Sequence, residues 1–312
     1  MERVSIGDTG RSLKPGKGIN AETLKIIALI SMTVYSIGNS FIDGMYLNMQ
    51  IIPHTPLGAA IYYLFIILGA PSFVLFTFLI TEGFRHTSDR KAYIIRLLAA
   101  AVLSELPFDL FYSGTGNLLL QNILFSYIIA FITLWIIDNI LNKTRGNAEN
   151  KAKMSRGAAI LFICLAALVG LLTAELIRGF YGIMVVAMAL VFYFFREKKS
   201  AVFIGGLITF FAGFWVSRTL SDVLSIVTEL KLKHIVKYSF TVNDLIAAIT
   251  ANIGISAITT AGAVLGLLLI MFYNGKKGYA HPKIFYYLYF PLHMLLLVFV
   301  CFILMLLLQG MR

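Results

Sequence analysis

The chain has 312 residues, of which 59% are hydrophobic and 13% are charged, and it carries a formal net charge of +11. A soluble domain carries roughly 25% charged residues, so this composition excludes an ordinary soluble fold and favours a protein that crosses a membrane several times. The Lys and Arg residues lie between apolar runs and form no basic face with interleaved aromatic residues. The positive charge therefore does not indicate nucleic-acid binding.

The polar segment 1–20 contains several glycines and a proline, and it predicts a flexible cytoplasmic tail. Apolar runs long enough to cross a membrane, which takes about 20 residues, follow it to the C-terminus. These runs are 22–42, 58–83, 95–112, 118–141, 157–175, 179–195, 201–217, 245–273 and 284–308. We therefore expect residues 21–312 to form one all-α domain, a polytopic transmembrane helix bundle of about nine spans. Segment 218–244 predicts either an amphipathic helix on the membrane surface or a short solvated loop helix.

The basic residues are distributed unevenly between alternate loops. Of the 26 Lys and Arg residues, 20 lie in one set of loops and six in the other. Cytoplasmic loops of membrane proteins carry the excess of Lys and Arg. The richer set is therefore predicted to be cytoplasmic, which puts the N-terminus of a multi-pass cell-membrane protein in the cytoplasm. This set comprises the tail through Lys25 and the segments 85–96, 143–156, 196–199 and 276–283.

A dense group of polar residues ends the second apolar run. Glu82, Arg85 and His86 lie close together, and Arg90 and Arg96 follow them. Glu82 and His86 are four residues apart and share one face if the helix continues. A basic pocket at the cytoplasmic membrane face would suit a phosphate-bearing donor such as a coenzyme A thioester. For Arg90 and Arg96, a charged helix end that reaches toward water is an equally good interpretation.

Two carboxyl residues lie inside the third apolar run. Glu105 and Asp109 are four residues apart and share a helical face, and Pro107 between them loosens the helix. Glu105 lies about ten residues past the start of the run, or roughly 15 Å deep in a core about 30 Å thick. A carboxyl group at that depth is a candidate functional residue by default. The alternative is a structural partner for an arginine or a helix end.

The last run contains His293, again near mid-depth, where a histidine can act as a general base or be a satisfied core residue. His54, His234 and His281 lie in predicted loops or in the surface segment, and we expect them to be solvated. The sequence contains no metal-ligand spacing, no glycine-rich phosphate loop and no nucleophile elbow. The residues therefore predict a membrane-embedded polar site, without a metal, that opens to the cytoplasm through a basic rim.

Several segments taken together resemble the TraX family of integral membrane proteins, which are named for acetylation of the pilin amino terminus during conjugation. The resemblance covers most of the first 135 residues and the last span, whereas residues 140–275 match only in hydropathy. The segments that carry it are Leu24–Met32, Ile37-Gly38, Phe78-Leu79, Glu82–Thr87, Tyr93, Arg96, Ser104–Asp109, Asn122–Phe125 and Tyr287–His293.

The chain departs from the family pattern in its first two spans. The pattern has an Asp-His pair just before Ile-Gly, where this chain has Tyr35 and Ser36, and it has an Arg in the second span that is not found near Gly69. In related membrane acyltransferases a His in an early span is thought to be the catalytic base or acyl carrier. This protein would then be inactive or use another residue, for which His293 is the obvious substitute. Ser36 would be a nucleophile or a substrate-binding hydroxyl only with a base beside it.

The resemblance implies a membrane-embedded acyltransferase that moves an acetyl or acyl group from acetyl-CoA, or another acyl-CoA, to an amine or hydroxyl. It implies that His293 is the general base and that Glu105 or Asp109 orients it. The acceptor would be an unidentified peptide, glycan or lipid, reached within the lipid bilayer. The donor phosphates would be bound at a rim made of Glu82, Arg85, His86, Arg90 and Arg96.

Two other functions stay open at this point. A catalytically inactive relative that binds a lipid, peptide or membrane partner is favoured by Tyr35 and Ser36. A small-molecule transporter is compatible with polar residues at mid-depth, although the halves of the chain show no internal repeat. A wide polar path across the membrane would favour transport, and a one-sided pocket that ends at His293 would favour the acyltransferase.

Overall fold

The computed structural model describes residues 18–39, 55–113, 120–145, 154–232, 241–279 and 281–309. Most of the predicted tail (residues 1–17), together with His54 and His234, lies outside these ranges. The division of the chain into a tail and one domain over 21–312 therefore stays a prediction.

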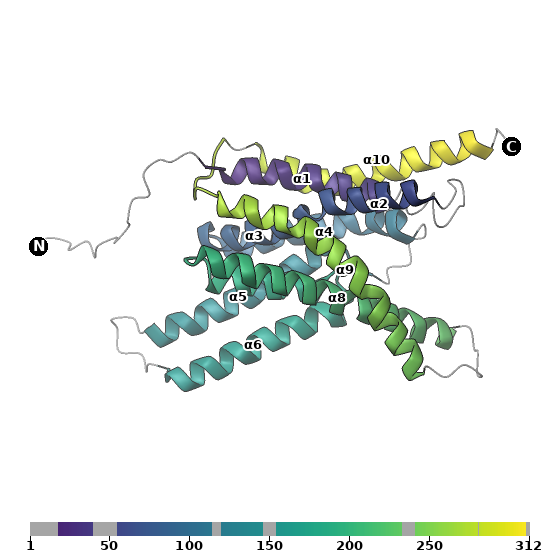
Figure 1. Ribbon diagram of the computed structural model, residues 1–312. Helices are drawn as coiled ribbons and strands as arrows, with labels where there is room; N and C mark the ends of the chain where they lie inside the picture. Colours follow the sequence, from purple (N-terminus) through teal and green to yellow (C-terminus); the bar gives the residue numbers. More distant parts are fainter. Residues whose placement is uncertain are drawn as a thin grey trace, which may run out of the picture.

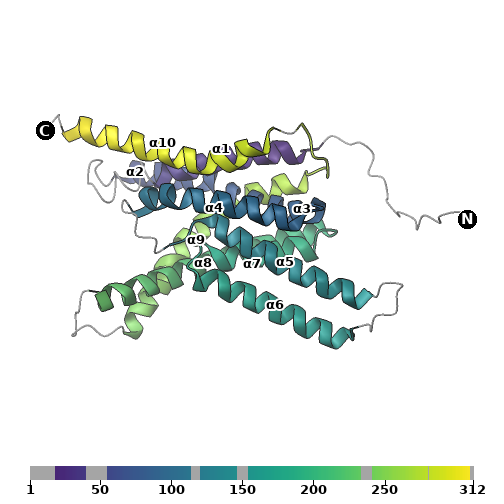
Figure 2. The same cartoon turned by 180° about the vertical axis from the view of Figure 1, so that it is seen from behind.

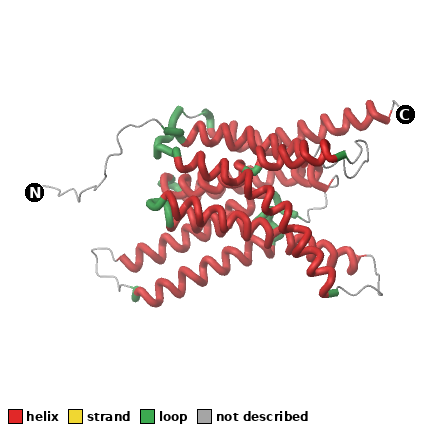
Figure 3. The backbone as a smooth tube through the Cα atoms, viewed as in Figure 1, coloured by secondary structure: helices red, strands yellow, loops and turns green. Residues whose placement is uncertain are grey.

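Within the described ranges the chain forms ten α-helices and no strand (Figure 3). Many large apolar side chains point outward, and Leu161, Leu168 and Leu172 on one helix are each more than half exposed, as expected of a surface that faces lipid. The helices are α1 (Ala21–Ile37), α2 (Pro56–Gly69), α3 (Pro71–His86), α4 (Arg90–Ser113), α5 (Ile123–Arg145), α6 (Arg156–Leu176), α7 (Gly182–Phe194), α8 (Lys199–Leu232), α9 (Val242–Met271) and α10 (Lys283–Gln309).

A helical membrane bundle agrees with the predicted fold class. Six helical segments are long and apolar enough to cross a membrane. The other three predicted runs correspond to α1, α4 and the short α7, so the count of nine spans stays a prediction. The six segments are Pro56–His86, Ile123–Thr144, Arg156–Leu176, Lys199–Leu224, Val242–Met271 and Ile284–Leu304.

The second predicted run is interrupted rather than continuous. It contains two helices, because α2 ends at Gly69 and α3 begins at Pro71. Proline has no backbone N–H to donate and is favoured in the first turn of a helix, so Pro71 starts a new helix. The Ala70 N–H still donates to the Ile66 carbonyl oxygen at 2.9 Å, so the helical hydrogen bonding of α2 extends to the residue just before α3.

The helices run between two ends of the bundle (Figures 1 and 2). At one end α1 and α10 begin and the chain turns at residues 87–89, 195–198, 272–279 and 281–282. We call it the basic end because Lys198, Lys276 and Lys277 lie in these turns. At the opposite, far end, α4, α8 and α10 terminate and α2 and α9 begin, whereas α1 ends and the chain turns at 177–181 deeper in the bundle, between this end and its centre. The helix α10 packs along α4 and touches α1, so the first and last helices are neighbours.

The structure corrects the interpretation of residues 218–244. A separate surface helix was one expectation there, but α8 continues without interruption from Lys199 to Leu232. The next helix, α9, begins at Val242 with a capping box in which Thr241 and Asp244 bind each other's backbone N–H groups. The apolar spacing of Leu220, Val223 and Leu224 therefore belongs to the end of a long helix.

A cluster of aromatic rings occupies the centre of the bundle, where the break between α2 and α3 lies. The Phe73 ring meets the rings of Tyr35 and Tyr181 edge-on, at centroid distances of 4.9 and 5.3 Å. Tyr181 also stacks on Phe214 at 4.5 Å. Edge-to-face and offset pairs at such distances are favourable beyond the area that they bury. The cluster joins α1, α3, α8 and the segment before α7.

We expect Gly69→Ala to lower the free energy of unfolding by about 1–3 kcal/mol, the usual effect of overpacking a core. A methyl group at Gly69 would overlap Cβ of Tyr35 and lie 2.5 Å from its Cα, so α1 must move away from α2. Thermal unfolding in detergent measures the effect. The matched control is Gly254→Ala on α9, where the methyl group meets no atom within 4 Å. Equal melting temperatures for the two variants would contradict the prediction.

Candidate active site

Ser36 and His293 meet in the interior of the bundle. Ser36 lies in the last turn of α1 and His293 near the middle of α10, and the Ser36 Oγ is 3.4 Å from the His293 Nε2. The exposed fractions of the two residues are 2% and 7%, so water has little access to either. The serine that replaces the family's early histidine therefore has a potential base beside it, which is the condition for a serine nucleophile.

A backbone carbonyl of α10 sets the tautomer of the neutral His293 ring. The Nδ1 atom is 3.0 Å from the Tyr289 carbonyl oxygen. A carbonyl oxygen can only accept, so this contact assigns the imidazole proton to Nδ1 and leaves Nε2 with a lone pair. That lone pair faces the Ser36 hydroxyl, as a base that takes up the serine proton requires.

Further contacts between α1 and α10 hold this arrangement in place. The hydroxyls of Thr33 and Tyr289 are 2.7 Å apart, one turn from the Ser36–His293 pair on both helices. The Tyr289 ring stacks on the His293 ring, with centroids 5.4 Å apart and an interplanar angle of 18°. The ring of His293 is therefore fixed by a stacked neighbour as well as by its two hydrogen bonds.

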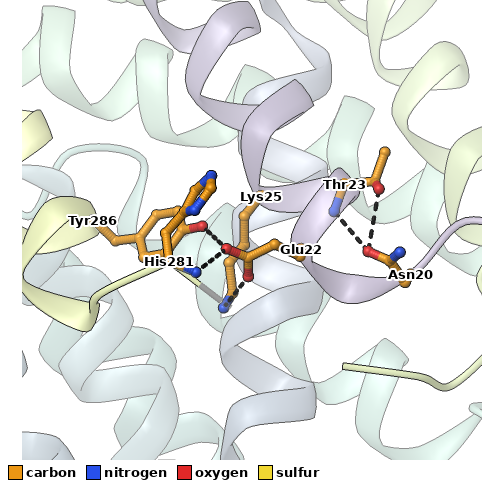
Figure 4. Close-up of polar contacts among 6 residues, drawn as sticks. All are labelled: Asn20, Glu22, Thr23, Lys25, His281 and Tyr286. Carbon is orange, nitrogen blue, oxygen red and sulfur yellow. Dashed lines mark hydrogen bonds and ion pairs between the residues drawn. The ribbon is translucent and has the colours of Figure 1, made fainter. Parts of the chain in front are cut away.

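A second set of contacts joins the beginnings of the same two helices at the basic end (Figure 4). Glu22 accepts hydrogen bonds from the Tyr286 hydroxyl and from the His281 backbone N–H, the latter at 2.9 Å. The Lys25 ammonium lies 3.2 Å from the other carboxylate oxygen of Glu22 and 4.8 Å from the centre of the Tyr286 ring. Glu22 is buried, so the start of α10 is anchored on a well-satisfied carboxylate.

Two neighbouring cavities lie between Ser36 and the basic end. An inner cavity of about 40 Å³ is lined by Ser36, and a larger rim cavity of about 370 Å³ opens beside α3, α4 and α10. Phe76 and Tyr127 line both cavities. Four basic side chains line the mouth of the rim cavity, whereas its inner wall is mostly apolar. They are Lys25, His86, Arg96 and Lys277.

Of the residues predicted to bind donor phosphates, His86 and Arg96 line the rim cavity. The Arg96 Nε is buried and has no hydrogen-bond partner among the described residues. Lys25 and Lys277 were not predicted, because nothing in the sequence shows which of the many basic residues at this end face the same cavity. The basic rim is therefore made by α1, α3, α4 and the connection before α10.

The other three predicted phosphate ligands make contacts within the protein. Glu82 is buried and forms an ion pair with Arg196, in which the Arg196 Nε lies 2.9 Å from the carboxylate. Arg85 donates to the Tyr193 carbonyl oxygen. Arg90 pairs with Asp138 at 2.8 Å, and its guanidinium lies over the Phe84 ring. These contacts tie α3 and α4 to α5 and α7.

We expect Glu82→Gln to lower the free energy of unfolding by about 1–3 kcal/mol, because it leaves the Arg196 guanidinium without its carboxylate partner. The affinity for an acyl-CoA should change little, since Glu82 does not line the rim cavity and touches it only through His86, whose Nε2 lies 3.5 Å from the Glu82 carboxylate. Thermal unfolding and donor titration separate the two effects. A weaker donor affinity at unchanged stability would instead return Glu82 to the donor site.

Glu105 and Asp109, the two carboxyl residues of α4, have different surroundings. Glu105 accepts from the side chain of Asn122 and, at 3.4 Å, from its backbone N–H, so it holds the residue that precedes α5. Its other carboxylate oxygen is buried without a partner among the described residues. The hydrogen bonds of His293 go to Ser36 on α1 and to Tyr289 on α10, so these two helices orient the ring, and a role for Glu105 in its orientation stays a prediction. A role for Asp109, which is buried one turn along α4, stays a prediction.

His293 is also reached from the side of the bundle. It lines a groove of about 810 Å³ together with Thr33, Tyr289 and several exposed leucines of α10. In the part of the chain that the structure describes, no three His, Cys, Asp or Glu side chains are placed to hold a metal ion. The arrangement thus offers a hydroxyl that lines the inner cavity and an imidazole that contacts this hydroxyl from the side of the lateral groove.

Comparison with known proteins gives one finding. A family model described as TraX protein matches residues 20–301, nearly the whole chain. No curated protein and no solved structure gives a significant match.

Proposed function

The chain belongs to the TraX family, and from this premise and the geometry of the bundle we propose that it is a membrane-embedded acyltransferase. It would transfer an acetyl or other acyl group from an acyl-CoA to an amine or a hydroxyl. The observation that carries the proposal is the 3.4 Å contact between the Ser36 Oγ and the His293 Nε2. The pair lies behind a cavity whose mouth is basic, which is the shape that a donor with a phosphate-rich head and an acyl end requires.

The donor would bind from the basic end, which we assign to the cytoplasm, where coenzyme A thioesters are made. Lys25, His86, Arg96 and Lys277 would bind its phosphates by charge-assisted hydrogen bonds. The thioester arm would pass Phe76 and Tyr127 and bring the acyl carbonyl to Ser36. A cavity with an apolar wall suits the arm, because the arm has few charged groups.

The chemistry would proceed in two displacements. His293 takes the Ser36 proton at Nε2 while Ser36 Oγ attacks the thioester carbonyl, the carbon–sulfur bond breaks, and the thiol leaves with that proton. The acceptor then attacks the acyl-serine ester. The bond between the acyl carbon and Ser36 breaks, and the acceptor proton returns to Ser36 through His293. Serine and histidine are thereby restored, and no other reactant is needed.

The cavities do not favour the transporter alternative. The inner cavity is about 40 Å³, against about 370 Å³ at the rim. It is lined mainly by aromatic and apolar side chains, including Phe73, Phe108 and Phe290. A wide polar path would be the expected feature of a transporter, whereas a narrowing apolar passage suits a reactive group that must be shielded from water.

The test uses the purified protein in nanodiscs with acetyl-CoA that is radiolabelled on the acetyl group. We expect slow release of free thiol and a covalent label on the protein. Ser36→Ala should abolish the label, and Ser200→Ala, an exposed serine in the first turn of α8, should retain it. Activity that appears only in Ser36→His would identify an inactive relative that retained the donor site. Failure of the wild-type protein to bind acetyl-CoA would remove the acyl-donor proposal.

A further inference from the structure

A polar pocket lies at the far end of the bundle, away from the rim cavity. Its volume is about 140 Å³, and its walls come from α6, α8 and the connection between α6 and α7. Liquid water occupies about 30 Å³ per molecule, so the pocket has room for a small polar group with two or three attached carbons. The ionisable side chains that line it are Glu175, Arg178, Tyr181, Arg218 and Asp222.

The connection that forms one wall of this pocket has an unusual backbone. Arg178 and Tyr181 have φ angles of 55° and 52°, and they are the non-glycine residues with positive φ in the described part of the chain. Such a conformation costs on the order of 1–3 kcal/mol for a residue with a bulky side chain. The Gln121 backbone holds the connection, since its N–H donates to Arg178 and its carbonyl accepts from Phe180. The strained backbone therefore holds the side chains of Arg178 and Tyr181 in fixed positions at the pocket.

Both carboxylates of the pocket already accept hydrogen bonds, whereas its two arginines keep N–H groups without acceptors among the described residues. The Glu175 carboxylate already accepts from the Ser217 hydroxyl at 3.3 Å, and Asp222 accepts from Asn252 at 2.7 Å. The Arg178 guanidinium makes no hydrogen bond or ion pair with any residue that the structure describes. Arg218 donates from its Nε to Asn252 at 3.2 Å and also hydrogen-bonds the Tyr181 side chain, which leaves further N–H groups of its guanidinium for a ligand. A ligand rich in acceptors would satisfy these groups.

The pocket also borders the site of the proposed reaction. Phe180 lines both this pocket and the inner cavity at Ser36. Tyr181 lines the pocket and Tyr35 lines the inner cavity, and their hydroxyls are 3.5 Å apart. Phe180 and the two tyrosines thus form a thin aromatic partition. The rim cavity, the inner cavity and the far-end pocket follow one another from one end of the bundle to the other.

We propose that the far-end pocket binds an anionic group, a carboxylate or a phosphate, of the acyl acceptor through Arg178 and Arg218. The proposal rests on the acyltransferase function. The acceptor enters from the end opposite to the donor, and its amine or hydroxyl passes the partition to reach the acyl group on Ser36. The two substrates then occupy separate cavities and do not compete for one entrance.

Acceptors that share a two-carbon chain and an amine test this proposal. In β-alanine the other end is a carboxylate, in phosphoethanolamine it is a phosphate, and in ethanolamine it is a neutral hydroxyl. Transfer of labelled acetyl groups to each is measured with the protein in nanodiscs. We expect at least a tenfold lower KM for one or both anionic acceptors than for ethanolamine, and the stronger of the two identifies the anion.

Variants of the two arginines connect that preference to the pocket. Arg218→Gln and Arg178→Gln should each remove most of the preference, and Arg218→Lys should retain part of it. Arg156→Gln, an exposed arginine at the other end of α6, is the matched control and should keep the full preference. Because Arg218 is half-buried in a hydrogen-bond network, the Arg178 variant keeps the test valid if the Arg218 variants do not fold.

The outcomes separate this proposal from the acyltransferase function. Stabilisation of the wild-type protein against heat by the anionic compounds, lost in Arg178→Gln, supports the pocket even if acetyl-CoA is not turned over. Turnover with no preference for anionic acceptors overturns the pocket proposal and keeps the acyltransferase. Transfer only to phosphatidylethanolamine of the nanodisc would also overturn it, because the acceptor would then enter through the lateral groove at His293.

Discussion

Acetyl-CoA turnover should fall by about 10²–10⁴-fold in His293→Ala, the usual contribution of a positioned general base. The Ser36 hydroxyl is a weak nucleophile, and its contact at 3.4 Å with Nε2 is the proton path that the substitution removes. The neutral imidazole is the active form, so wild-type turnover should also decline at low pH as the ring takes up a proton. Thiol release measured across the pH range tests both expectations.

The matched control for this prediction is His281→Ala. The His281 ring is exposed, and it is the backbone N–H of this residue that binds Glu22, so the anchor at the start of α10 is retained. His293→Ala at the wild-type rate, or an equal loss in both variants, would show that His293 is not the base. Thermal unfolding of both proteins distinguishes a chemical effect from a loss of fold.

The second large effect is expected at the basic rim. Arg96→Gln and Lys277→Gln should each raise the KM for acetyl-CoA by about tenfold or more, because a hydrogen bond to a charged group contributes about 1.5–3 kcal/mol. Both side chains line the rim cavity and neither lines the inner cavity at Ser36, so KM should change more than kcat. Initial rates over a range of acetyl-CoA concentrations measure both parameters.

A donor without phosphates tests whether the rim residues act by binding phosphate. S-acetyl-N-acetylcysteamine carries the same thioester on a short neutral arm, and the rim variants should lose far less activity with it than with acetyl-CoA. Arg156→Gln, exposed at the same end of the bundle, controls for the loss of one positive charge. Equal losses with both donors would mean that the rim residues act on the fold or on the chemistry and do not bind phosphate.

The helices could be predicted because a long apolar run in a bilayer must satisfy its own backbone hydrogen bonds, and an α-helix does so within one segment. The interruption at Pro71 was missed, since hydropathy stays high through it and only the proline signals a new helix. The end of α8 was also misjudged. Its apolar spacing fits a surface helix as well as the end of a long helix, and periodicity alone does not distinguish them.

The sequence identified candidate residues of the site, but it did not show which of them contact one another. His293 and Ser36 are each conspicuous in the sequence, yet their contact depends on how α10 lies against α1. The depth of Glu105 was informative, but its observed partner Asn122 lies in the following connection, as the helix-end alternative would require. Arg90 was indistinguishable from Arg96 because the Asp138 that pairs with Arg90 lies 48 residues further along the chain.

Ser36 and His293 are separated by 257 positions of the chain, on the first and the last helix of the described structure. At 5–20 residues per second, synthesis of the stretch between them takes on the order of tens of seconds. Throughout that time the growing chain carries the serine without its imidazole. Incomplete translation products would therefore present an unactivated hydroxyl to acyl thioesters, and reactivity would arise only when the last helix joins the first.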